Sequence, residues 1–155
     1  MKKRTKKYKP REVVLNPLNY FLGGLKKVDD EHLTELNVKN HLALVNMLQG
    51  NGTREDWDKL CGMVNMALVL TEQHFDRQYL DMLYKARDAI KEIGRRMIKI
   101  HSFVLKGEEK TAIENALEVH EAQLTALRVI DIERATDEVY RRVKYHINTE
   151  KVMVK

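Results

Sequence analysis

Apolar residues recur at intervals of three and four over most of the chain, a pattern that predicts amphipathic helices. In the first predicted helix, which begins near Asp30, the recurring positions are Leu33, Leu36, Leu42, Val45 and Leu48. Gly50-Asn51-Gly52 ends this run, and Thr53, followed by the acids Glu55 and Asp56, is expected to cap a second helix. Two helices joined by so short a turn should form an antiparallel hairpin.

The apolar positions after Thr53 complete the second helix and predict two further helices. In the second helix the apolar stripe consists of Trp57, Leu60, Cys61, Val64, Ala67, Leu68 and Thr71. A third is expected to start at a cap on Asp76, continue to Val104 and end at Gly107. The fourth keeps a heptad-like seam at Ile113, Leu117, His120, Leu124 and Leu127, and its phase slips at residues 129–132. That slip indicates either one long helix whose later part meets another partner, or a kink at residues 128–131.

These elements predict an all-α fold, a bundle of about four main helices in a single domain over residues 12–148. A basic arm, residues 1–11, precedes the domain, and a short tail, residues 149–155, follows it. Residues 13–15 have β propensity and Pro17 follows them closely, so any extended segment there should be short. We expect the apolar residues before Gly23-Gly24 to lie against the helical body.

Charge is distributed unevenly along the chain. The arm holds seven cations among eleven residues: Lys2, Lys3, Arg4, Lys6, Lys7, Lys9 and Arg11. Residues 12–140, in contrast, hold 16 basic and 22 acidic side chains, so the net charge of +5 comes from the two ends. Such an arm can neutralise phosphates without a folded recognition helix, and Tyr8 within it could stack on a base. Nucleic-acid binding through the arm is therefore one functional hypothesis.

The sequence contains no motif typical of a metal site, a phosphate-binding loop or a catalytic nucleophile. The six histidines are scattered without ligand spacing, no phosphate-binding loop follows a strand, and no serine lies in a nucleophile elbow. The single cysteine, Cys61, cannot form an intramolecular disulfide and lies on a helical stripe. No apolar run approaches the length of a membrane span, and no signal peptide is apparent. We therefore predict a non-enzymatic cytoplasmic protein without a cofactor or metal.

Two helical segments are apolar on more than one side, residues 42–48 and residues 64–70. A helix of this kind is either central in a bundle or also meets a partner. Since a small bundle has few central helices, the pattern favours contact with a second copy or with another protein. The candidate contact residues are Leu44, Met47, Met66 and Val69.

Short motifs along the chain carry a family resemblance. They are Lys7-Tyr8-Lys9-Pro10, Asn37-Val38-Lys39-Asn40-His41, Thr53-Arg54-Glu55-Asp56 and the helical residues 118–124. With these motifs the chain resembles a group of small, basic-headed helical proteins of bacteriophages and prophages. The resemblance implies a phage accessory protein in the cytoplasm of a bacterial host, with a phage or host protein as a further possible partner. It implies no catalytic residue.

Overall fold

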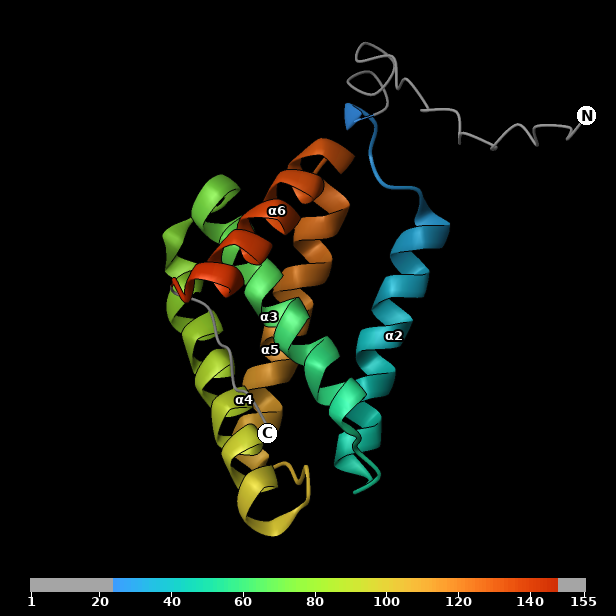
Figure 1. Cartoon of the computed structure of the whole chain (residues 1–155). Coiled ribbons are helices and arrows are strands. Elements are labelled where there is room, and N and C mark those ends of the chain that lie inside the picture. Colours follow the sequence, from blue (N-terminus) through green and yellow to red (C-terminus); the bar gives the residue numbers. More distant parts are fainter. Residues whose placement is uncertain (1–23, 148–155) are drawn as a thin grey trace, which may run out of the picture.

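The computed structural model describes residues 24–147, and within this range the fold is all-α, as predicted. Five helices follow one another: α2 (Asp30–Leu48), α3 (Arg54–His74), α4 (Leu80–Ile100), α5 (Gly107–Ala126) and α6 (Val129–Tyr145). A short 3₁₀ helix, η1 (Arg77–Tyr79), precedes α4. Helices α2 to α5 run side by side, and α6 crosses one side of the bundle obliquely (Figure 1). No strand forms between residues 24 and 147.

Helices α2 and α3 form the predicted hairpin, and both have capped N-termini. The side chain of Asp29 accepts a hydrogen bond from the His32 amide, which belongs to the first turn of α2. At the start of α3, Thr53 and Asp56 form a capping box in which each side chain accepts from the other residue's backbone amide. Gly50 adopts a φ of 78° in the connecting turn, a conformation that glycine tolerates best.

Helix α3 is the centre of the bundle, because α2, α4, α5 and α6 all pack against it. Its Trp57 indole donates a hydrogen bond to the Ile90 carbonyl of α4 and stacks on Phe103 with ring centroids 6.3 Å apart. Around these rings lies a dense core whose fully buried members include Met47, Leu60, Leu83, Ile90, Ile93, Ile113 and Leu117. The surplus of apolar positions on α3 therefore reflects its central place.

The third predicted helix is shorter than expected at both ends. Asp76 caps η1, and α4 begins only at Leu80. At the other end α4 stops at Ile100, where His101 adopts a left-handed conformation with a φ of 52°. The chain then turns so that Phe103 enters the core. Gly107 is the first residue of α5, and so the stop predicted at this glycine lies several residues too late.

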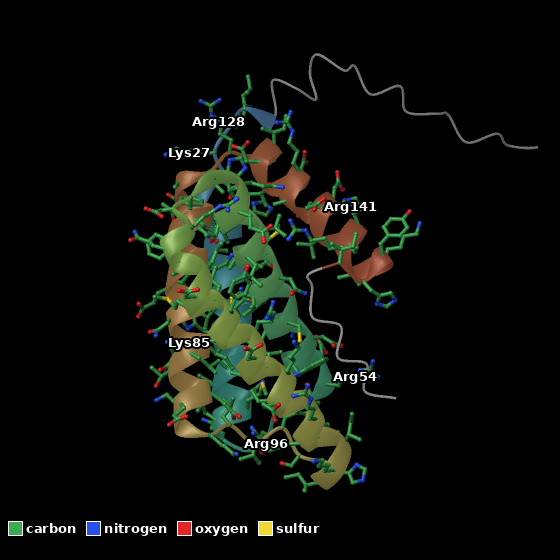
Figure 2. All side chains as sticks on the ribbon, turned by 90° about the vertical axis from the view of Figure 1, so that its left-hand side faces the viewer. Lys27, Arg54, Lys85, Arg96, Arg128 and Arg141 are labelled. Atoms are coloured by element: carbon green, nitrogen blue, oxygen red, sulfur yellow. The ribbon has the colours of Figure 1, made fainter. Side chains whose placement is uncertain are left out.

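The fourth predicted helix is in fact two helices, so the kink expected at residues 128–131 is nearer to the structure than one continuous helix, but the chain is interrupted here and not only bent. Leu127 and Arg128 have extended backbones between α5 and α6. The Val129 amide donates to the carbonyl of Lys26 at 2.9 Å, and Lys27 forms an antiparallel bridge with Arg128 (Figure 2). Contacts with residues that precede α2 therefore keep the connection between α5 and α6 extended. The phase slip in the sequence marks the start of a separate helix.

Several predicted features lie outside the described residues, namely the arm at residues 1–11, the extended segment at residues 13–15 and the tail at residues 149–155. Within residues 24–147, none of the helices combines the length and the hydropathy that a membrane span requires.

Candidate interaction surfaces

The outer side of α2 carries a row of apolar side chains, which we call the α2 stripe: Val38, Leu42, Val45 and Leu48. About half of each side chain is exposed, with 58% for Val38 and 56% for Leu42. The opposite side of the same helix buries Ala43, Leu44 and Met47 against the bundle. Helix α2 is thus apolar on two sides, and the described part of the chain covers only one of them.

The α2 stripe borders a shallow hollow between α2 and α5. His41 on α2 pairs through Nε2 with the Glu121 carboxylate on α5, and this contact links the two helices. Thr34 and Asn37 complete the lining beside Val38, Leu42 and Val45. Because the hollow is shallow, a partner would meet a ridge of side chains here and not a deep cavity.

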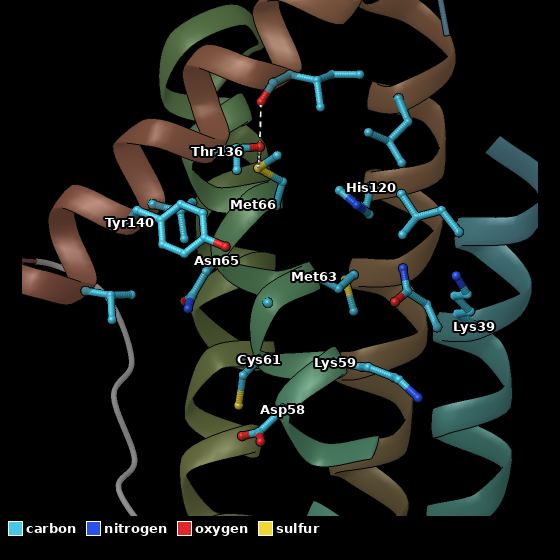
Figure 3. Close-up of a pocket in the computed structure, with 17 residues that line it drawn as sticks. Lys39, Asp58, Lys59, Cys61, Met63, Asn65, Met66, His120, Thr136 and Tyr140 are labelled. Carbon is cyan, nitrogen blue, oxygen red and sulfur yellow. Dashed lines mark hydrogen bonds between the residues drawn. The ribbon is translucent and has the colours of Figure 1, made fainter. Parts of the chain in front are cut away.

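The second surface is a groove over α3, with α6 on one side and α2 and α5 on the other (Figure 3). Its volume is about 530 Å³. The apolar residues that line it, from α2, α3, α5 and α6, include Leu36, Met63, Met66, Leu124, Ile132, Val139 and Val143. Cys61 also contributes to the lining and is half-buried. We call this feature the α3 groove.

Polar side chains are buried among the apolar residues of the α3 groove. Asn40, Asn65 and His120 all line it and are nearly inaccessible, with His120 only 3% and Asn65 only 6% exposed. Asn65 Oδ1 and His120 Nδ1 have no hydrogen-bond partner within residues 24–147. A buried polar atom without a partner is costly, typically by about 1–3 kcal/mol. The groove therefore presents unsatisfied polar groups as well as apolar surface.

Burial determines the charge state of His120. Removal from water disfavours the imidazolium and lowers the pKa of His120 to about 4, while the neighbouring Gln123 side chain opposes this shift. The ring is therefore neutral at pH 7. It lies on α5 and points toward Met66 on α3 (Figure 3). In this state one ring nitrogen can accept a hydrogen bond.

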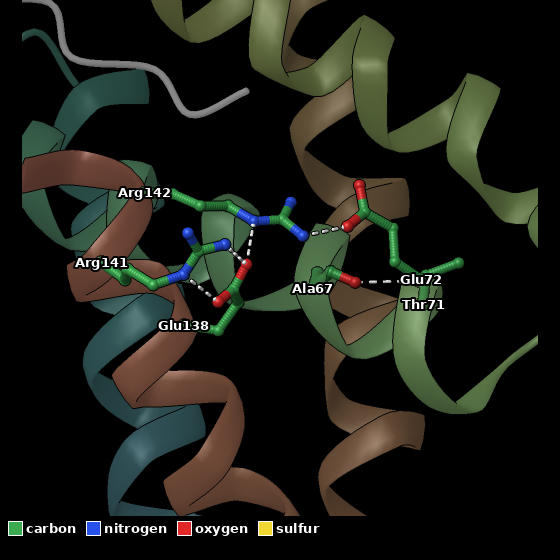
Figure 4. A network of polar contacts seen from close by, with 6 residues as sticks. All are labelled: Ala67, Thr71, Glu72, Glu138, Arg141 and Arg142. Atoms are coloured by element: carbon green, nitrogen blue, oxygen red, sulfur yellow. Dashed lines mark hydrogen bonds and ion pairs between the residues drawn. The ribbon is translucent and has the colours of Figure 1, made fainter. Parts of the chain in front are cut away.

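A polar network fastens the far end of α6 to α3 (Figure 4). The Arg142 guanidinium pairs with Glu72 on α3 and with Glu138 one turn earlier on α6. Arg141 also pairs with Glu138, through two hydrogen bonds of 2.7 Å. Hydrogen bonds from Arg141 and Arg142 lower the pKa of Glu138 to about 2. The network is exposed on one side and holds α6 in place beside the groove.

The candidate contact residues from the sequence do not share one surface. Leu44, Met47 and Val69 are 4%, 1% and 2% exposed, and therefore pack inside the bundle where no partner reaches them in this structure. Met66 is half-buried and lines the α3 groove. The basic arm residues, Lys2 to Arg11, lie outside the described residues.

The assignment of faces on the first helix also needs correction. The sequence predicts one apolar face from Leu33, Leu36, Leu42, Val45 and Leu48, yet Leu33 is half-buried and the other four are exposed. The core is reached by Asn40, Ala43, Leu44 and Met47 instead. Because both sides of α2 hold apolar residues at helical spacing, periodicity alone gave no preference. The small residue Ala43, which permits close helix packing, is the one local signal that favours the true inner face.

The described residues contain no group of three histidine, cysteine, aspartate or glutamate side chains arranged to hold a metal ion. Comparisons with models of known protein families, with curated proteins and with solved structures found no match to this chain. Its class is thus defined by its fold and surfaces: a small all-α bundle with an apolar helix face and an apolar groove.

Proposed function

We propose that this is a non-enzymatic accessory protein, of the phage type that its sequence resembles, and that it acts through protein–protein contacts of helical faces. The observation that carries this proposal is the α2 stripe. It presents four large aliphatic side chains on one continuous helical face, each about half exposed to water. A contiguous apolar patch of this kind is typical of an interaction surface, whereas isolated exposed apolar residues are not.

The first occupant that we propose for the α2 stripe is a second copy of the same helix. Val38, Leu42 and Val45 step by four and three, the spacing of a coiled-coil seam. The first turn of α2 is acidic, with Asp30 and Glu31, and its last turn has no basic residue. A parallel pair would place the acidic turns side by side. An antiparallel pair about a two-fold axis separates them and sets Val38 against Val45 of the second copy.

The test is the solution mass of the Leu42→Glu variant, measured by light scattering over a concentration series. We expect the wild-type protein to dimerise and Leu42→Glu to remain monomeric, because a carboxylate would be buried at the centre of the seam. Ile100→Glu is the matched control, since Ile100 is equally exposed (59%) but lies at the end of α4. A wild-type monomer at every concentration, or an unchanged dimer in Leu42→Glu, would contradict the proposal.

A second candidate function is nucleic-acid binding through the basic arm, and the distribution of charge favours it. Residues 24–147 hold 19 basic and 21 acidic side chains, so the helical body does not itself supply a strongly positive charge. The seven cations at residues 2–11 are separate from it. Deletion of residues 2–11 should then abolish binding to short duplex DNA, and added salt should weaken the wild-type complex steeply. Binding that survives the deletion would exclude the arm as its source.

A further inference from the structure

The α3 groove is an apolar surface within reach of an apolar segment of the same chain. We propose that residues 13–22 occupy this groove and cover Met66, Ile132 and Val139. The proposal is independent of the α2 stripe, which lies on the outer side of α2. Three observations support it: the place where the described chain begins, the composition and length of the segment before it, and the unsatisfied polar atoms in the groove.

The described chain begins beside the first turn of α6, the helix that forms one wall of the groove. Gly24 is buried against the first turn of α6, where a Cβ on this glycine would lie 3.0 Å from the Ile130 side chain. The hydrogen bond from Val129 to the Lys26 carbonyl fixes the same point. Ile132, two residues further along α6, lines the groove, whereas Ile130 lies on the other side of the helix. The residues before Gly24 therefore start at the N-terminal end of α6, about one helix diameter from the groove.

The composition and length of the segment fit the groove. Seven of its ten residues are apolar: Val13, Val14, Leu15, Leu18, Tyr20, Phe21 and Leu22. The α6 wall of the groove extends from Ile132 to Val143, a distance of about 16 Å along a helix axis. Ten residues span about 15 Å as a helix and at most about 33 Å when extended. The segment can therefore line this wall in either conformation.

The polar atoms of the groove also find partners in this segment. Asn65 Oδ1 is an acceptor, and the neutral ring of His120 provides a second acceptor or a donor according to its tautomer. Asn16 and Asn19 carry side-chain amides that both donate and accept, and the backbone supplies further N–H groups. Both orphan atoms are already buried beneath the groove surface, so an occupant reaches them only when the neighbouring side chains shift. A peptide segment then offers polar partners, which a purely aliphatic occupant does not.

Covalent attachment favours this occupant over others. A segment joined to Gly24 is present at a high effective concentration, which a separate molecule does not have. The C-terminal residues 148–155 are also joined to the bundle, but only three of the eight, Val152, Met153 and Val154, are apolar. The same segment from a second copy would make the same contacts in trans. These two alternatives are distinguishable by experiment.

The single cysteine of the chain lies in the groove and provides the test. Leu15→Cys, Leu18→Cys and Phe21→Cys are each made in the full-length protein and oxidised mildly with diamide. We expect at least one variant to form a disulfide with Cys61 inside the monomer, identified by peptide mass after digestion. Arg4→Cys, in the arm, is the matched control and should cross-link far less. The same variants with Cys61→Ser should not cross-link.

The cross-linking outcomes separate the alternatives. A disulfide between two chains would place the segment in the groove of a second copy and overturn the proposal for the same chain. Cross-linking at all three positions no faster than in Arg4→Cys would overturn it altogether. Because the cross-link is read in the full-length protein, the result does not depend on whether a shortened chain folds.

Deletion provides a second and independent readout. Removal of residues 2–22 should expose the groove, raise the fluorescence of a bound apolar dye and lower the melting temperature by several degrees. Removal of residues 2–11 alone should leave both unchanged. If removal of residues 149–155 exposes the groove instead, the tail is its occupant and the proposal fails.

Discussion

Helix α6 and the helices it packs against are held together by different kinds of contact. Between α3, α4 and α5, apolar side chains such as Leu60, Leu83 and Leu117 are completely buried. Helix α6 buries only Ala135 to that degree, while Ile132 and Val139 remain partly accessible. The first region is a dense core. The second is a helix laid over the bundle with a groove beneath it.

The ion pairs follow the same division. In the dense region, Arg96 on α4 reaches the Glu109 carboxylate on α5 through two nitrogens and also donates to the Val104 carbonyl at 2.7 Å. These contacts of Arg96 span the connection between α4 and α5, where Phe103 also packs into the core. On α6 only Ala135 is completely buried, and the ion pairs of Arg142 supply a large part of the contact with α3. From this contrast we infer that α2 to α5 carry most of the stability, and that α6 mainly shapes the groove.

The sharpest test of this contrast compares one core leucine with one residue under α6. Leu60→Ala should lower the free energy of unfolding by about 2–5 kcal/mol, because it removes a completely buried side chain and leaves a cavity. Ile132→Ala should cost less, about 1–2 kcal/mol, because the described helices bury its side chain only in part. Urea denaturation of both variants measures the difference. Equal losses would mean that α6 belongs to the same core.

His120 makes stability depend on pH, and the sign of the effect follows from its lowered pKa. Below pH 6.5 the unfolded chain binds a proton at His120, whereas the folded protein resists protonation down to about pH 4. The contribution of His120 is therefore fully present above pH 6.5 and is lost as pH falls to about 4. The loss is on the order of 3 kcal/mol at most.

The measurement for His120 is a series of urea denaturations between pH 4 and pH 7. We expect the wild-type free energy of unfolding to decline across this window and His120→Gln to show a flatter profile, since the variant lacks the buried imidazole whose pKa is lowered. His41→Gln is the control, because His41 is exposed on α2. A wild-type profile as flat as that of His120→Gln would show that the folded protein protonates this ring as readily as the unfolded chain does.

Local signals in the sequence were sufficient to predict the fold class and the starts of two helices. Thr53 caps α3 as expected because a capping box needs only residues close together in the chain. The end of α4 was missed for the opposite reason. Ile98, Ile100 and Val104 continue the helical period, but the turn is set by Phe103 packing on Trp57 and by Arg96 reaching Val104, which are contacts between distant residues.

The candidate surfaces were predicted less well than the fold. The sequence shows that α2 and α3 are apolar on more than one side, but not which side faces outward. For α3 the four neighbouring helices supply the explanation, so Val69 is a core residue. For α2 the described residues cover only one side, and the exposed apolar residues are those of the α2 stripe. The α3 groove depends on the oblique placement of α6, which no local pattern records.

The smallest expected effect concerns the network that fastens α6. Arg142→Gln should remove the pairing with Glu72 and Glu138 and lower the free energy of unfolding by about 1 kcal/mol, since the network is partly exposed to solvent. Arg141→Gln is the matched control, because Arg141 contacts Glu138 but does not reach α3. Amide hydrogen exchange in α6 should accelerate in Arg142→Gln and change little in Arg141→Gln.

The same network also depends on pH, because Glu138 must be ionised to pair with Arg141 and Arg142. Its pKa is lowered to about 2 from an ordinary value of 4.5, so its contribution is present above pH 4.5 and disappears as pH falls toward 2. The protection of α6 amides should therefore decline in this window before the exchange of core amides in α3 accelerates. If α3 and α6 lose protection together at every pH, α6 is part of one cooperative unit and the contrast between the two regions is structural only.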